Sequence, residues 1–453
     1  MTLAHNCLRA AVSAAALAAL LAVPTTAHGA TRLVTTCADG GTGSLRATVA
    51  AAASGDTVDL RSLACHRIVL TSGAIAIAQH DLAIRGPGIN RFAVSGNYSS
   101  SVFRHGGTGT LTLRGMAIEQ GAYRIHDNAN GGCIYSAGSV DGNDIAVRHC
   151  AAYAVLGAQG GGIYAAGNVT LFYSTVYSNG VVGASSAGGA VTVGTVGPDG
   201  ALSGLLRAHR TRFLGNTAGT GGAIRALGGV NITYSTIANN RARASGGGID
   251  SFGPSRIAYS TISGNTAGDQ AAAFHLSGNT SIENTTISGN AAPFISIGYL
   301  SGPSTITNST IAYNVTTTPF DSNCFPGALL IWNDTEIEST ILARNTCNGE
   351  LGFDITGFGP SGVNPPPPPV ITGGDNLIER FALTTVPADT ITGVDPLLGP
   401  LADNGGRTLT HLPAAGSLAI DRGNNLAGFL VDQRGDGFPR TKGARTDIGA
   451  VER

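Results

Sequence analysis

Apolar residues recur along this chain at a nearly constant interval, and each is followed three residues later by Asn. Within one unit they alternate with polar residues, as over 230–236, which is the period of a strand with one buried face. A short strand of this kind cannot bury its apolar face alone, so successive units must stack. The positions spaced by 24 or 25 residues are Phe213, Ile237, Ile262, Ile287 and Ile311.

A second apolar position lies 13 residues before the first in each unit, as Ile224 before Ile237 and Ile249 before Ile262. Two strands therefore keep one register from unit to unit. The alternation excludes helical repeats, and the Leu and Asn spacing of a leucine-rich repeat is absent. The sequence predicts an all-β fold, a right-handed parallel β-helix of the pectate-lyase-like solenoid type, with about nine to eleven coils.

Gly and Asn residues are expected at the turns between these strands. Paired glycines before the inward Ile suit turns with positive φ, and Asn is the other residue that tolerates the left-handed conformation. Stacked Asn side chains can also hydrogen-bond from coil to coil. The series extends upstream to Val147 and Ile118, with Cys150 and Gly121 in the place of Asn, and downstream to Ile341, with Arg344 in that place.

The chain divides into four parts. Residues 1–29 carry an apolar run too short to span a bilayer and predict a signal peptide, hence an exported protein in the medium or at the cell surface. The region 30–100 is expected to hold an N-terminal cap, with a helix over 44–53, and the first coils. The repeats follow over 101–394, with a Pro-rich loop inserted at 360–370, and 395–453 is an irregular C-terminal cap packed on the final coils.

Composition and cysteines narrow the function. The formal charge of −1 provides no field to attract nucleic acid, and no further segment is apolar enough to cross a membrane. The exported part would hold six cysteines, and an even number favours disulfides over a metal site. Fifteen pairings exist; by position the cysteines group as Cys37 with Cys65, Cys133 with Cys150, and Cys324 with Cys347.

Both ends of the mature chain match a family pattern. Ser44-Leu45-Arg46, followed by Gly55-Asp56-Thr57-Val58, resembles the opening of exported bacterial β-helix proteins with a CSLREA-like N-terminus. The run DPLLGPLADNGGRTLTHLPAAGSLAIDRG at 395–423, with DQRGDGFPR at 432–440 and TDIGAVE at 446–452, resembles their choice-of-anchor Q region. The resemblance implies a secreted or cell-surface β-helix protein with no settled activity.

One set of residues could carry chemistry. The position after each inward apolar residue is expected to face solvent, and in successive units it is occupied by Tyr135, Tyr164, Thr192, Arg225, Asp250 and His275. Stacked coils would place Arg225, Asp250 and His275 about 5 Å apart as candidate catalytic residues. Tyr135 and Tyr164 further along the column are candidate substrate-binding residues. The alternative is a solvated strand face whose ion pair contributes little.

The sequence therefore leaves two functions open. The first is a non-catalytic protein that serves in adhesion or binds a polysaccharide or cell-envelope glycan. The second is a polysaccharide lyase or glycoside hydrolase that acts on an acidic polysaccharide through Arg225, Asp250 and His275. No cofactor or metal ligand is expected, and Ca²⁺ stays an option without a clear motif. The sequence does not indicate an oligomeric state.

Overall fold

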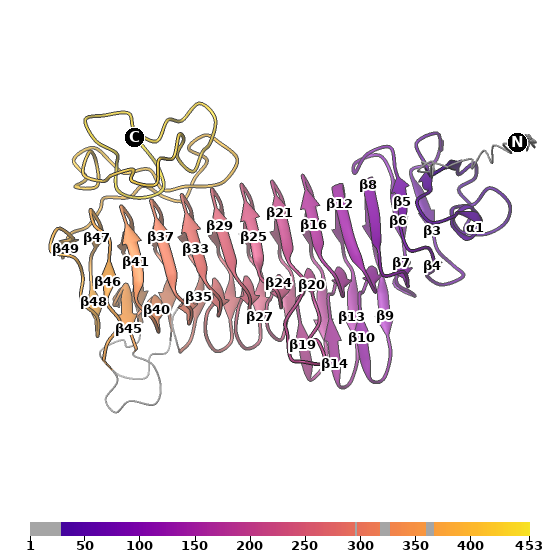
Figure 1. Cartoon of the computed structure of the whole chain (residues 1–453), viewed down its shortest axis with the longest axis horizontal. Helices are drawn as coiled ribbons and strands as arrows, with labels where there is room; N and C mark the ends of the chain where they lie inside the picture. The colour runs from indigo at the N-terminus through magenta and orange to yellow at the C-terminus, as the bar shows by residue number, and fades with distance from the viewer. Residues whose placement is uncertain (1–28, 295–296, 318–326, 359–366) are drawn as a thin grey trace, which may run out of the picture.

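A computed structural model describes residues 29–294, 297–317, 327–358 and 367–453. The described chain is almost entirely β, with one seven-residue helix, α1 (Leu45–Ala51). Its coils stack into the predicted parallel β-helix (Figure 1). One sheet takes a single strand from each coil and counts twelve coils, slightly more than the nine to eleven expected. Its strands are β4 (Ile75–Ile77), β7 (Phe103–His105), β11 (Ile134–Ser136), β15 (Ile163–Ala165), β20 (Val191–Val193), β24 (Ile224–Ala226), β28 (Ile249–Ser251), β32 (Phe274–Leu276), β36 (Gly298–Leu300), β40 (Leu329–Ile331), β45 (Ile355–Gly357) and β48 (Phe381–Ala382).

The coil that contains β28 illustrates the unit. Three further strands complete it: β29 (Ser255–Ala258), β30 (Thr261–Ser263) and β31 (Thr266–Ala267). Each strand is too short to fold alone, and each pairs in parallel with its counterparts in the coils before and after. The inward side chains are buried and join the same rows of the core, as the alternation predicts: Ile249, Ile257, Ile262 and Ala267.

The predicted register holds through the middle of the solenoid. Ile237 pairs with Phe213 on one side and with Ile262 on the other, and the row continues to Ile311. The downstream extension is wrong by one residue, because Ile311 pairs with Leu342 and not with Ile341. The inward amide of that coil belongs to Asn345, which accepts from the Asn314 backbone N–H at 3.0 Å. Arg344 takes the left-handed position before it, with φ of 59°.

A ladder of buried Asn side chains runs inside one corner. Asn265 donates its Nδ2 to Oδ1 of Asn290 at 2.9 Å and to the Ile237 carbonyl at 2.9 Å. The same contacts repeat in each coil, so the expected coil-to-coil bonding is confirmed. The expected φ is wrong, because the left-handed residue is the one before the Asn, such as Gly264 with φ of 64°. The ladder comprises Asn179, Asn216, Asn240, Asn265, Asn290, Asn314 and Asn345, and it ends on Asp354.

A second ladder, of Ser and Thr hydroxyls, lies inside the neighbouring corner. The Ser235 backbone N–H donates to Oγ of Ser260, and the Ser260 N–H donates to Oγ1 of Thr285. The residue before each hydroxyl is again left-handed, as at Tyr259 with φ of 52°. The two ladders satisfy the backbone donors that the bends would otherwise leave unpaired inside the core.

Disulfides and the helix reinforce the N-terminal end. Ser44 caps α1 by accepting from the Ala47 N–H at 3.2 Å, and Leu45 and Val49 of the helix enter the core. Cys37 is bonded to Cys65, as their grouping suggested.

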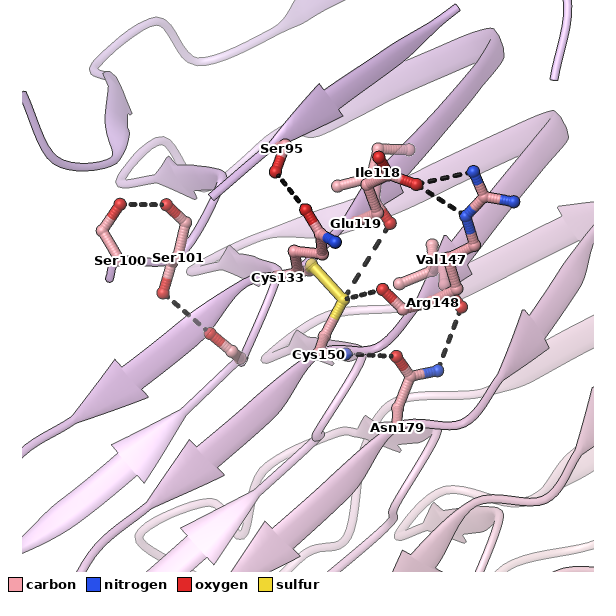
Figure 2. Close-up of a disulfide and its surroundings, with 12 residues drawn as sticks. Ser95, Ser100, Ser101, Ile118, Glu119, Cys133, Val147, Arg148, Cys150 and Asn179 are labelled. Carbon is pink, nitrogen blue, oxygen red and sulfur yellow. Dashed lines mark hydrogen bonds and ion pairs between the residues drawn. A yellow bond between two sulfur atoms is a disulfide. The ribbon is translucent and has the colours of Figure 1, made fainter. Parts of the chain in front are cut away.

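Cys133 is bonded to Cys150 inside the solenoid (Figure 2). The Cys150 N–H donates to Oδ1 of Asn179, so Cys150 occupies the first place of the Asn ladder. The expected partner of Cys347, Cys324, lies outside the described residues, as do the predicted signal peptide up to residue 28 and most of the Pro-rich loop.

The closing region 395–453 is irregular, and it lies along the flank of the later coils (Figure 1). Gln433 accepts from Oγ1 of Thr286 at 2.6 Å and donates to Oγ1 of Thr261 at 3.0 Å. The Ala450 N–H donates to Oγ1 of Thr310 in the next coil. This region therefore covers a row of outward Thr side chains at the ends of β30, β34 (Thr286–Ser288) and β38 (Thr310–Ala312). Among the described residues, no helix is long and apolar enough to cross a membrane.

Candidate functional site

The predicted column of outward side chains exists in the twelve-stranded sheet. Asp250 of β28 pairs with Arg225 of β24 and with His275 of β32. Towards the N-terminus, Arg225 follows Thr192 of β20, and the two tyrosines complete the row. The constant 13-residue spacing thus brought the three candidate catalytic residues side by side.

Asp250 does not face solvent, contrary to the expectation. Its side chain is 2% exposed, and both carboxylate oxygens are engaged. Oδ2 accepts from Nη1 of Arg225 at 2.5 Å, and Oδ1 lies 3.0 Å from Nδ1 of His275. Phe252 closes over the group, because the Arg225 guanidinium lies 4.8 Å from the centre of its ring and His275 packs against its edge. Thr192 is buried as well, since its hydroxyl donates to the Ala187 carbonyl.

His275 keeps partial access to solvent. Its side chain is 22% exposed, and its Nε2 lies 3.4 Å from the hydroxyl of Ser277. Tyr299 of the next coil packs edge-on against the imidazole at 4.9 Å between ring centres, and burial raises the pKa of the Tyr299 hydroxyl. A substrate could reach the imidazole edge, whereas the Asp250 carboxylate behind it can only position the ring.

Tyr135 and Tyr164 stack on each other instead of presenting open faces. Their ring planes differ by 4°, and their centres lie 5.6 Å apart. The Arg104 guanidinium covers the other face of Tyr135 at 4.5 Å. Burial raises the pKa of the Tyr164 hydroxyl, and the charge of Tyr135 adds to that effect. The pair can therefore offer ring edges and hydroxyls to a ligand, and the stacking face that a sugar ring prefers is occupied.

A hollow of about 610 Å³ opens beside Arg225, and we refer to it as the arginine hollow. Arg225 borders it from β24, and Arg243 borders it from the turn after β27 (Arg241–Ala242). Thr220 lies between them, and Gln159, Ser185 and Ser186 form the opposite wall. Two guanidinium groups beside hydroxyl and amide groups suit a carboxylated or otherwise anionic ligand.

The wall of the arginine hollow is a small extra sheet. Its three parallel strands are β10 (Asn128–Asn130), β14 (Gly157–Gln159) and β19 (Ser185–Ala187), at the outer edge of the coils (Figure 1). The chain between the corner of Asn179 and the next Gly pair is long enough for this strand, whereas the corresponding loop after Asn216 is short. The wall therefore ends at β19, and the hollow lies at the step.

The two guanidinium groups are held by one nitrogen each. Arg225 uses Nη1, which donates to Asp250 and, at 3.0 Å, to Oγ1 of Thr220. Arg243 uses Nη2, which donates to the Gly183 carbonyl at 2.7 Å and to Oγ of Ser186 at 3.0 Å. Within the described ranges, the remaining N–H groups of both side chains have no protein partner, and Arg243 has no carboxylate partner. These donors are free for a ligand.

The sequence analysis missed this second arginine and the wall. A signal did exist, because the loops after Cys150 and Asn179 are longer than those after Asn216 and Asn240. Loop length alone does not show which way an extra strand turns. As for metals, the described part of the chain holds no group of three or more His, Cys, Asp or Glu side chains placed to share an ion.

Comparisons with known proteins add little to this picture. No family model matches the chain, so neither the choice-of-anchor Q nor the CSLREA resemblance is confirmed. No curated protein matches it either. Among solved structures, the crystal structure of the pectate lyase Pel9A is similar over 94% of this chain and 97% of that one, with 14% sequence identity and a TM-score of 0.44. A likeness at this level carries no conclusion about activity or substrate.

Proposed function

We propose that this protein is exported by the signal peptide over 1–29, to the medium or the cell surface, and binds an acidic glycan without cleaving it. The observation that carries the proposal is the arginine hollow, with two guanidinium groups whose outward donors are free. Arginine donors of this kind pair in a bidentate way with carboxylates such as those of uronic acids. The two disulfides support export, because disulfides persist in oxidising compartments.

The state of Asp250 supports binding over catalysis. A carboxylate that is 2% exposed and shared between Arg225 and His275 cannot approach a glycosidic bond. Its negative charge instead holds the Arg225 side chain against the sheet, so that the free edge of the guanidinium keeps one orientation. On this proposal, Asp250 and His275 position the arginine, and adhesion to an acidic surface polysaccharide is the biological use.

Cleavage of an acidic polysaccharide by a lyase or hydrolase is the second candidate. The observation in its favour is the bond between His275 and Asp250, because a carboxylate on Nδ1 fixes an imidazole for proton transfer through Nε2. His275 then acts as the base or acid and Arg225 binds the substrate carboxylate. The resemblance to choice-of-anchor Q proteins stays a proposal about retention at the surface.

Affinity electrophoresis in gels that contain polygalacturonate, alginate or hyaluronan tests the proposal. Retardation by at least one polymer at low salt, lost in Arg243→Ala and kept in Arg207→Ala, supports the arginine hollow. Arg207 is the matched control, since it is exposed on another sheet and has no ion pair among the described residues. Release of unsaturated or reducing ends by the wild type, lost in His275→Ala, favours the enzyme instead.

A further inference from the structure

A second groove runs along the solenoid on a different face from the arginine hollow. Its volume is about 790 Å³, and it extends from the coil of Leu205 to the coil of Thr372. It lies where β25 (Val230–Thr233), β29, β33 (Thr280–Glu283), β37 (Ser304–Thr307) and β41 (Thr335–Glu338) begin. The closing region 395–453 covers the opposite ends of these strands, which leaves the groove open to solvent (Figure 1). We refer to it as the axial groove.

A column of glycines makes the concave bend of the axial groove. A Cβ on Gly253 would lie 2.3 Å from the Gly228 backbone, one on Gly278 would lie 2.5 Å from that of Gly253, and one on Gly302 would lie 2.6 Å from that of Gly278. No side chain fits between these stacked backbones, so nothing fills the bend. The groove is therefore a consequence of close backbone packing at one corner.

The turn at this corner is the same in successive coils. The hydroxyl of Ser255 donates to the Gly253 carbonyl at 3.1 Å, and Thr280 and Ser304 make the same bond to Gly278 and Gly302. Thr335 repeats it once more with the Asn333 carbonyl. Identical turns give a straight groove whose repeat is the coil spacing of about 4.8 Å. Six successive strand pairings, from β21 (Leu206–His209) to β46 (Ile371–Thr372), make it roughly 29 Å long.

One side of the axial groove carries a polar side chain on every coil. Asn231, Arg256, Ser281, Thr305 and Glu336 occupy successive rungs of one column. In the described part of the chain, the Asn231 amide and the Thr305 hydroxyl make no hydrogen bond. The other side is less polar, with exposed Pro254 and Pro303 at the rim.

The charges along the groove disfavour an anionic ligand. Nε and Nη2 of Arg256 are engaged by Glu283, at 3.1 and 2.5 Å. Asp334 and Glu336 add two carboxylates, and Glu336 has no cationic partner among the described residues. A ligand that fits this lining is uncharged, long and straight, with an apolar side and hydroxyl groups that recur at the coil spacing.

We infer that the axial groove binds a linear neutral polysaccharide in an extended conformation, parallel to the solenoid axis. One extended pyranose residue is close in length to one coil, so each sugar would meet one polar side chain and one apolar rim position. The C–H faces of the sugars would pack on Pro254, Pro303 and the glycine bend, and their hydroxyls would bond to Asn231, Ser281 and Thr305. This site is independent of the arginine hollow and of the acidic glycan proposed for it.

The test uses calorimetric binding of cellohexaose, mannohexaose and xylohexaose to the whole protein, with maltohexaose as a curved oligomer of equal size. We expect at least one extended hexamer to bind, its trimer to bind at least tenfold more weakly, and maltohexaose not to bind. Ser281→Tyr should weaken the hexamer at least tenfold, because the ring fills the middle of the groove. Arg243→Ala, in the arginine hollow, should leave the affinity unchanged.

Failure of all three extended hexamers to bind would overturn the inference, as would equal affinity of Ser281→Tyr and wild type. Should Ser281→Tyr fold poorly, hydroxyl-radical footprinting of the wild type provides the second measurement. Protection of Pro254 and Pro303 by the bound hexamer is expected, and protection confined to Arg225 and Arg243 contradicts the assignment. Failure of polygalacturonate to bind bears only on the arginine hollow, so the two proposals can be told apart.

Discussion

Nη1 of Arg225 lies 2.5 Å from Oδ2 of Asp250, and the carboxylate that it meets is almost completely buried. The two residues stand on adjacent strands of one sheet, 25 positions apart in the chain. Their pairing decides the function of the whole column, because it removes the strongest candidate base from solvent. It also leaves the free edge of the arginine directed at the arginine hollow.

Asp250→Ala should destabilise the fold by about 3–5 kcal/mol, because removing one partner leaves a buried charge without compensation. Asp141→Ala is the matched control, since Asp141 pairs with Arg114 at 2.8 Å but both side chains are about one third exposed. That change should cost less than about 1 kcal/mol. Urea unfolding followed by circular dichroism measures both, and equal effects would show that Asp250 is not structurally engaged.

Asn265→Ala removes one rung of the Asn ladder and should cost about 2–4 kcal/mol. The change leaves the N–H of Asn240, the side-chain amide of Asn240 and the Ile237 carbonyl without their partners inside the core. Asn279→Ala, at an exposed Asn outside the ladder, should stay within about 0.5 kcal/mol. Thermal unfolding of the two variants side by side checks this, and similar melting temperatures would contradict a structural ladder.

The stability of the C-terminal coils should fall between about pH 4 and pH 7 because of Asp354. Burial raises the pKa of this carboxyl to about 7, against a usual value of 3.8. The folded state therefore holds the proton more tightly than the unfolded state, so the free energy of unfolding is highest below the unfolded pKa. It decreases as the pH rises towards 7, by at most about 1.4 kcal/mol per pH unit.

Denaturant unfolding at several pH values tests this assignment. In Asp354→Asn the group no longer titrates, so the decrease between pH 4 and pH 7 should flatten. Asp199→Asn, at an exposed carboxylate, should keep the wild-type slope. An unchanged slope in Asp354→Asn would assign the pH dependence to other carboxyl groups, such as Glu338, whose pKa is also raised by burial.

Loss of the inner disulfide should lower stability more than loss of a surface contact. Cys133 and Cys150 close a loop of 17 residues, for which a disulfide contributes about 3 kcal/mol. The double variant Cys133→Ala, Cys150→Ala should therefore unfold at a clearly lower denaturant concentration under non-reducing conditions. The same midpoint for this variant and the wild type would mean that the bond does not form in solution.

Much of the fold could be predicted because the solenoid repeats one simple rule. A period of two and a fixed offset of 13 residues place Ile224, Ile249 and Phe274 in one row, and their neighbours Arg225, Asp250 and His275 then form a column. The offset failed where a coil changes length, as at Ile341, where the register moved by one residue to Leu342. Local alternation does not record such a shift when two apolar residues stand together.

The environment of the site could not be predicted in the same way. Whether Asp250 is buried depends on Arg225, His275 and Phe252 closing over it, and these side-chain contacts leave no periodic trace in the sequence. The arginine hollow depends on where the extra sheet ends. Arg243 joins it only because it reaches back to Ser186, two coils away.

The most direct test of binding without cleavage is calorimetry of hexameric galacturonate at low salt with wild type, Arg243→Ala and Arg207→Ala, followed by chain-length analysis of the recovered sugar. The account predicts that the wild type binds and returns the hexamer intact. Arg243→Ala should lose about tenfold in affinity, equivalent to about 1.4 kcal/mol, and Arg207→Ala should match the wild type. Shortened or unsaturated product from the wild type, or equal affinity in Arg243→Ala, would contradict it.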